Sequence, residues 1–193
     1  CPADSTLLAR RAAMADFAAL ARRLGDTTDA YAQGEVVNEV YDAWFARAAA
    51  HAKATSSAAL PKPGSAREIA SATRAALEIL AGGSAEPNPL VGMDDFAATS
   101  LLEAFTKVVS LLREKPKFLA LARSADGLPI LQWLEGPALQ RLEATALASA
   151  ARGPNRAGAL RAVVAVLLLG DAVRSAAAAA PAEGPDPGPA PPV

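Results

Sequence analysis

Side chains that carry chemistry are scarce in this chain. Its 193 residues include one cysteine and one histidine, and aromatic residues make up only 5%. A single cysteine excludes an internal disulfide, and a histidine-dependent hydrolase would rest on His51 alone. The sequence also lacks a Cys/His cluster for zinc, an Asp-rich calcium loop and a glycine-rich nucleotide loop. We therefore expect a protein that is not an enzyme and that carries no metal and no cofactor.

An excess of charge of one sign is also lacking. The 19 basic and 20 acidic side chains are spread along the chain and give a net charge of −1. Binding to nucleic acid requires a basic patch or stripe, and none emerges from the sequence. We expect no nucleic-acid partner.

Helix-forming residues dominate what is present. Hydrophobic residues, many of them alanine, make up 52% of the chain, and runs of β-branched residues are nearly absent. Apolar residues recur at helical spacing in segments that glycine, proline and serine separate. We predict an all-α protein in which residues 1–180 form a single bundle of about six to eight helices. The expected helices cover residues 6–24, 29–54, 65–81, 95–115, 116–124, 129–135, 137–151 and 157–173.

The most hydrophobic stretch is 157–173, in which no polar side chain occurs from Val163 to Leu169. Apolar residues on every side of a helix are typical of one that neighbours surround. A membrane span needs about 20 apolar residues, whereas Arg161 and Asp171 leave only nine between them. We therefore expect this segment to be the central core helix of the bundle.

Local patterns place several helix ends. Gly25 is expected to stop the first helix, and Asn155 to cap the helix of 157–173. Ser65 and Glu68 have the spacing of a capping box, and Pro137 is expected to open a new helix. Asp94 or Asp95 begins the fourth helix. Residues expected to face the core include Val37, Val40, Tyr41, Trp44, Phe45, Leu77, Leu80, Leu101, Phe105, Leu142 and Leu147.

Three residues are candidates for contact with a partner: Trp44, His51 and Trp133. His51 follows Trp44 by one heptad on the same apolar side. No acidic residue stands at the spacing of a helical metal site, so we favour a structural histidine at a helix end. Trp133 lies in a short helical segment, where an aromatic ring serves either the core or an exposed anchor, and we favour the core.

The two ends of the chain suggest a location. A cysteine at position 1 is typical of a mature bacterial lipoprotein, in which lipid on Cys1 anchors the protein to a membrane of the cell envelope, on its periplasmic or extracellular side. The alternative is a fragment cut from a longer protein. Residues 181–193 are rich in proline and contain nothing that forms a core, so we expect a disordered spacer there. The first hypothesis is thus a membrane-tethered helical accessory protein that binds a partner protein.

Two other functions are compatible with the sequence. The order of CPAD, DTTDAYAQ, SAREIASATRAALEIL, LLEAF and DGLPILQWLEGPALQRL resembles a helical part of the large tegument protein of alphaherpesviruses. The similarity covers about two-thirds of the chain, with large gaps, and leaves out 157–173. It implies a scaffold segment of a larger assembly, such as a virion. The last alternative, a ligand-binding bundle, requires a polar-lined cavity around His51 and Glu39.

Overall fold

The computed structural model describes residues 16–54, 63–83, 88–149 and 153–179, and all regular structure in these ranges is helical. The predicted all-α class is confirmed. Cys1 and the predicted tail of 181–193 lie outside the described residues. The helices are α2 (Phe17–Asp26), α3 (Ala30–Ala54), α4 (Pro63–Leu80), α5 (Asp95–Glu114), α6 (Pro116–Arg123), α7 (Leu128–Trp133), the π-helical turn η1 (Leu134–Ala138), α8 (Leu139–Ala148) and α9 (Pro154–Ala178).

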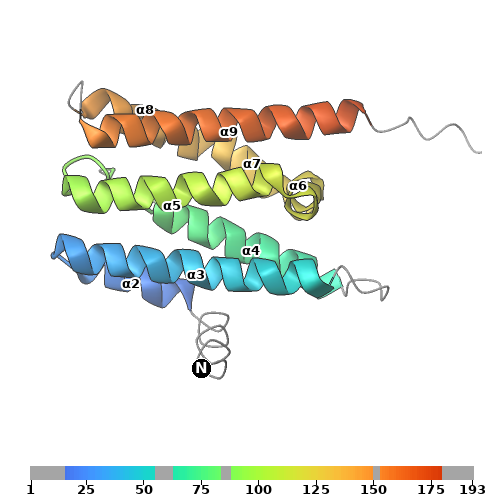
Figure 1. Cartoon of the computed structure of the whole chain (residues 1–193), viewed down its shortest axis with the longest axis horizontal. Coiled ribbons are helices and arrows are strands. Elements are labelled where there is room, and N and C mark those ends of the chain that lie inside the picture. The colour runs from blue at the N-terminus through green and yellow to red at the C-terminus, as the bar shows by residue number, and fades with distance from the viewer. Residues whose placement is uncertain (1–15, 55–62, 84–87, 150–152, 180–193) are drawn as a thin grey trace, which may run out of the picture.

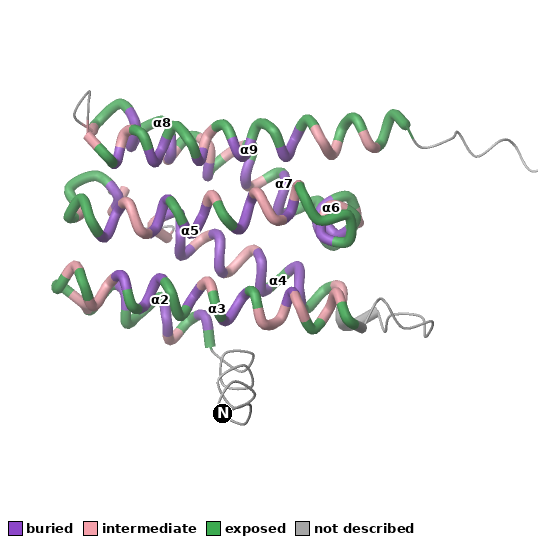
Figure 2. The backbone as a smooth tube through the Cα atoms, viewed as in Figure 1, coloured by how far each residue is buried: buried purple, intermediate pink, exposed green. Residues whose placement is uncertain are grey.

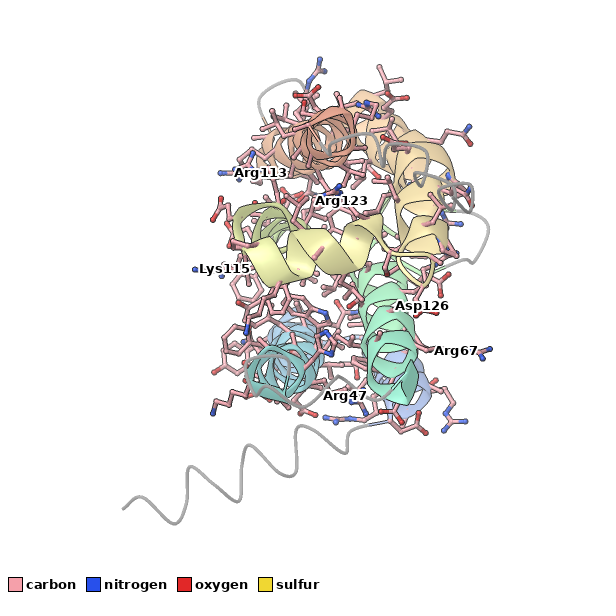
Figure 3. All side chains as sticks on the ribbon, turned by 90° about the vertical axis from the view of Figure 1, so that its right-hand side faces the viewer. Arg47, Arg67, Arg113, Lys115, Arg123 and Asp126 are labelled. Atoms are coloured by element: carbon pink, nitrogen blue, oxygen red, sulfur yellow. The ribbon has the colours of Figure 1, made fainter. Side chains whose placement is uncertain are left out.

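The helices form two layers (Figures 1 and 3). The long helices α3, α5 and α9 lie side by side in one layer, with α5 in the middle, and all three run in the same direction (Figure 1). The second layer contains α2, α4, α7 and α8, and α6 crosses the end of the bundle at which α3 and α5 terminate. Every long helix of the first layer therefore has both a side neighbour and a helix of the second layer to pack against.

The core is centred on α5. This helix contacts α3, α4, α6 and α9, and its predicted apolar stripe is buried as expected. Burying one leucine or phenylalanine side chain contributes about 1.5–3 kcal/mol, so this stripe is a major source of stability. The buried residues of α5 are Ala97, Ala98, Leu101, Leu102, Ala104, Phe105, Val108, Val109 and Leu112.

The prediction that 157–173 is surrounded on every side is wrong. Helix α9 lies at the edge of its layer, and only the side that faces α5 and α8 is buried (Figure 2). Small residues on that side allow close approach: a Cβ added at Gly158 would lie 3.1 Å from Leu102 Cδ1. Larger side chains would hold α9 further from α5. The buried residues of α9 are Asn155, Gly158, Ala159, Ala162, Ala165, Val166, Leu169 and Gly170.

Proline decides two helix starts that the sequence analysis placed elsewhere. Helix α4 begins at Pro63, so Ser65 lies inside its first turn and cannot be the N-cap. Helix α9 begins at Pro154 and is preceded by Gly153 as N-cap, so the expected cap at Asn155 is also wrong. Proline has no N–H to satisfy and its fixed φ suits the first helical position, which makes it the stronger start signal here.

Two other boundaries differ from expectation. Asp16 has extended backbone angles and caps α2 by accepting the Ala18 N–H at 2.9 Å, so α2 begins at Phe17, and the start expected at residue 6 lies outside the described residues. Helix α2 then continues through Gly25 to Asp26. Pro137 does not start a new helix either. The π-helical turn η1 accommodates its ring and carries the chain from α7 into α8 without a break.

Some residues face the other way from their predicted side. Phe45 is 44% exposed and Leu147 is 81% exposed, whereas Val36 and Ala43 are buried in the core. Helix α3 packs against α5 on one side and α4 on another, so its buried arc is wider than one apolar stripe and is rotated away from Phe45.

The starts of α5 and α9 are joined by the buried side chain of Asn155. Its Nδ2 donates to Asp95 Oδ1 at 2.6 Å, and its Oδ1 accepts from Thr99 Oγ1 at 3.1 Å. These bonds hold the first turns of two parallel helices together.

Replacing this side chain should therefore destabilise the fold. We expect Asn155→Ala to lower the free energy of unfolding by about 1–3 kcal/mol, because a mostly buried hydrogen-bonded group is lost. Urea denaturation followed by circular dichroism measures the change. Asn38→Ala is the matched control, since Asn38 is exposed on α3, and it should shift stability by about 0.5 kcal/mol or less. Equal effects of the two variants would contradict the role of Asn155.

Candidate functional site

A stripe of large aliphatic side chains faces solvent along α9. The exposed residues recur every three or four positions, so they lie on one side of the helix (Figure 2). We call this the α9 outer face and define it by Leu160, Arg161, Val164, Leu167, Leu168 and Asp171. The exposed fractions of its four aliphatic residues are 47% for Leu160, 53% for Val164, 50% for Leu167 and 45% for Leu168.

The distribution of side chains on α9 is the reverse of what water favours. Its buried side is built mostly from glycine and alanine, while three of its four leucines point outward. Single exposed leucines are ordinary, but a contiguous exposed apolar stripe is typical of an interaction surface. Arg161 and Asp171 lie ten positions apart, which is about 15 Å along the helix, with Val164, Leu167 and Leu168 between them.

Trp44 was expected to face the core and was also a candidate for contact with a partner, and it lies in the core. It is fully buried, and its indole Nε1 donates to Thr73 Oγ1 at 3.0 Å. The Thr73 hydroxyl donates in turn to the Ile69 carbonyl at 2.7 Å, so the buried polar groups are satisfied. The ring also meets Phe118 of α6, with the ring centroids 6.2 Å apart. Trp44 thus joins α3, α4 and α6 and offers no surface to a partner.

His51 lies in the last turn of α3 and is partly buried. Burial lowers its pKa from the ordinary value, and the nearby positive charge of Lys117 lowers it further. Lys117, from the first turn of α6, donates from Nζ to the Ala52 carbonyl at 2.7 Å. The amine therefore binds a carbonyl at the end of α3, and its charge adds to the effect of burial on the pKa of His51. His51 lies at a helix end, as expected, and its contact with a partner stays a prediction.

Trp133 ends α7 and is partly buried against the core. The guanidinium of Arg74 lies over its ring, 4.5 Å from the centroid. Arg74 also pairs with Glu78 at 2.6 Å and donates to the Pro129 carbonyl at 3.2 Å. These contacts fasten α7 to α4, so the ring has a structural place with one side open to solvent.

Basic side chains gather at the end of the bundle that α6 crosses (Figure 3). Arg113, Lys115 and Arg123 come from the segment where α5 ends and α6 follows. The C-terminal ends of α3 and α5 meet there, and a helix C-terminus carries a partial negative charge that cations stabilise. Arg113 also pairs with Glu114 at 3.0 Å. The cluster is therefore explained by the helix ends themselves.

An open hollow of about 550 Å³ lies beside α2 and α4. Its lining is mostly apolar, and its one charged side chain, Glu78, already pairs with Arg74. Neither His51 nor Glu39 lines it. Glu39 instead pairs on the surface with Arg23 of α2 at 2.6 Å. The hollow thus lacks the convergent polar groups that a ligand-binding bundle around His51 and Glu39 would need.

Within the described ranges, no group of three or more His, Cys, Asp or Glu side chains is placed to hold a metal ion. None of the described helices is long and apolar enough to cross a membrane. No protein-family model matches the chain, and neither a curated protein nor a solved structure matches it. The resemblance to the tegument protein gains no support from these comparisons. The α9 outer face is therefore the candidate functional site of the described residues.

Removing the Lys117 charge should raise the pKa of His51. In Lys117→Gln we expect the pKa to move toward the ordinary value of about 6.5 but to stay below it, because burial is the larger cause. Titration of the imidazole by NMR measures the shift. Lys115→Gln is the matched control, since Lys115 is exposed on the same segment, and it should leave the pKa within error of wild type.

The lowered pKa also sets a pH dependence of stability. His51 has a lower pKa in the folded chain than in the unfolded chain, so between these two values the unfolded chain binds more protons. The contribution of His51 to the free energy of unfolding is therefore fully present above about pH 6.5. It is lost as the pH falls through the folded pKa. Lys117→Gln should narrow the pH range between the folded and unfolded pKa values of His51. An unchanged NMR titration would contradict the effect of the Lys117 charge on His51.

Proposed function

We propose that the protein is a non-enzymatic helical interaction protein that binds a protein surface through the α9 outer face. The observation that supports this most is the stripe of four half-exposed aliphatic side chains on one side of α9. Burying exposed apolar area of this kind against a partner contributes a favourable free energy of about 25 cal/mol per Å². Trp133, which is partly buried, already has the guanidinium of Arg74 over its ring within the chain.

A protein partner fits this face better than a lipid surface does. Helices that lie in a membrane interface carry a lysine- and arginine-rich polar side next to their apolar side. The α9 outer face instead carries one basic and one acidic residue, Arg161 and Asp171, on either side of Val164, Leu167 and Leu168. Opposite charges around an apolar centre are the usual composition of a protein–protein contact.

We further propose that Cys1 tethers the bundle to a bacterial envelope membrane. This proposal rests on the cysteine at position 1. A single acyl chain anchors a protein weakly, so stable attachment requires a multiply acylated Cys1. The alternative, a scaffold segment of a larger structural protein, predicts coding sequence on both sides of this stretch and would use the same α9 outer face.

Substitution of the cysteine tests the tether. We expect Cys1→Ser, expressed with its native leader in the source organism, to move from the membrane to the soluble fraction, because no thiol remains to carry lipid. Intact mass spectrometry of the wild type should show the mass of a diacylglyceryl or triacylated cysteine. An unmodified Cys1, or peptides that extend before it, would favour the scaffold segment instead.

Polar substitutions on the α9 outer face test the interaction. We expect Leu167→Gln combined with Leu168→Gln to abolish cross-links from α9 to another polypeptide in native membranes or extracts. Both side chains are about half exposed, so the melting temperature should change little. Leu147→Gln is the matched control, because Leu147 is 81% exposed on α8, and it should keep the cross-links. Cross-links unaffected by the double substitution would refute the proposed face.

A further inference from the structure

We propose that the partner of the α9 outer face is a second copy of this chain, bound antiparallel about a two-fold axis near residue 166. This inference rests on the proposed function, since it names the occupant of the same face. A two-fold contact requires a surface that is complementary to itself. On the α9 outer face, both the charges and two of the aliphatic residues have this property.

The charges of the face match under this symmetry. Arg161 and Asp171 are each five positions from residue 166, on opposite sides of it. An antiparallel pair centred there therefore sets Arg161 against the partner's Asp171, and Asp171 against the partner's Arg161. In a parallel pair each charge would instead meet its own copy, which is repulsive. The pattern thus selects the antiparallel arrangement.

Two of the four aliphatic residues match each other as well. The same axis places Val164 opposite the partner's Leu168, and Leu168 opposite the partner's Val164. Leu160 and Leu167 lie on the same side of α9 and flank this contact. All four side chains are about half exposed in the single chain, so the pairing removes apolar area from water on both copies.

The next charge along α9 does not oppose this arrangement. Arg174 donates from Nη1 to Glu135 Oε1 at 2.7 Å, so its charge is paired within its own chain. Toward the start of α9 the next charged residue is Arg156, which is partly buried and lies five positions before Arg161. The contact is therefore limited to about three turns of helix.

Such a contact is small. A standard protein–protein interface buries about 800 Å² per partner, which is more than three turns of one helix supply. We therefore expect a reversible dimer with a dissociation constant in the micromolar range. A membrane tether would raise the local concentration and favour pairing.

Charge reversal tests both the partner and the orientation. The protein is purified as the whole chain, and its dimer dissociation constant is measured by sedimentation equilibrium from low to several hundred micromolar. We expect Arg161→Asp and Asp171→Arg to raise this constant about tenfold or more each, since each turns two attractive contacts into repulsive ones. The combined variant should restore a value within about threefold of wild type, because it exchanges the two charges.

Two controls separate loss of this contact from loss of the fold. Leu147→Gln should leave the dissociation constant unchanged, and circular dichroism should show the same helix content in all variants. Higher salt should weaken the wild-type dimer modestly. A chain that stays monomeric over the whole range, or a dimer insensitive to both reversals, would overturn the inference. So would a combined variant as weak as the single ones, since a parallel or different contact would then be present.

The cross-linking experiment separates this inference from the proposed function. If the chain is monomeric but Leu167→Gln with Leu168→Gln still removes a cross-linked polypeptide of different sequence, the second copy is wrong and the interaction function stands. If the chain is monomeric and the double substitution removes no cross-link, both proposals fail.

Discussion

The position of α5 is the constraint on which the other helices depend. It lies between α3 and α9 and contacts both, and residues such as Leu101 and Phe105 on it are fully buried. The three helices run in one direction, so their starts and their ends meet at opposite ends of the bundle. Parallel helices set like partial charges together at each end. The chain offsets this with carboxylates such as Asp94 and Asp95 at the start of α5, and with Lys117 at the end of α3.

Close packing between α5 and α9 explains the unusual surface of α9. Gly158 brings the backbone of α9 against Leu102, and five of the eight buried residues of α9 are glycine or alanine. Val166 and Leu169 are the larger aliphatic residues on the inner side, while the four aliphatic residues of the outer face have no place there. The close packing of α9 against α5 thus determines which residues of α9 face the core and which form the α9 outer face.

Much of the fold could be predicted from the sequence, because the spacing of apolar residues and the positions of helix breakers are local properties. The stripe of α5 and the end of α4 before Gly82 followed from them. The side on which α9 is buried did not, since Val163 to Leu169 is apolar in every direction and hydrophobicity alone cannot orient such a run. The size of the residues carried that information, with glycine and alanine on the side that packs. The buried place of Trp44 also followed from the apolar side of α3, but its hydrogen bond with Thr73 did not, because it joins residues that are 29 positions apart.

The arrangement of charge on α9 bears on what kind of partner the face fits. An unrelated partner would have to supply charges of its own that match Arg161 and Asp171. A two-fold pairing supplies them from the same chain, because each charge then has a counterpart on the other copy. Two-fold pairing would also cover both α9 outer faces at once. The proposed dimer would then expose no further α9 outer face and could not grow into a filament through it. A chain with a net charge of −1 gains little solubility from charge, and a closed contact limits its association to two copies.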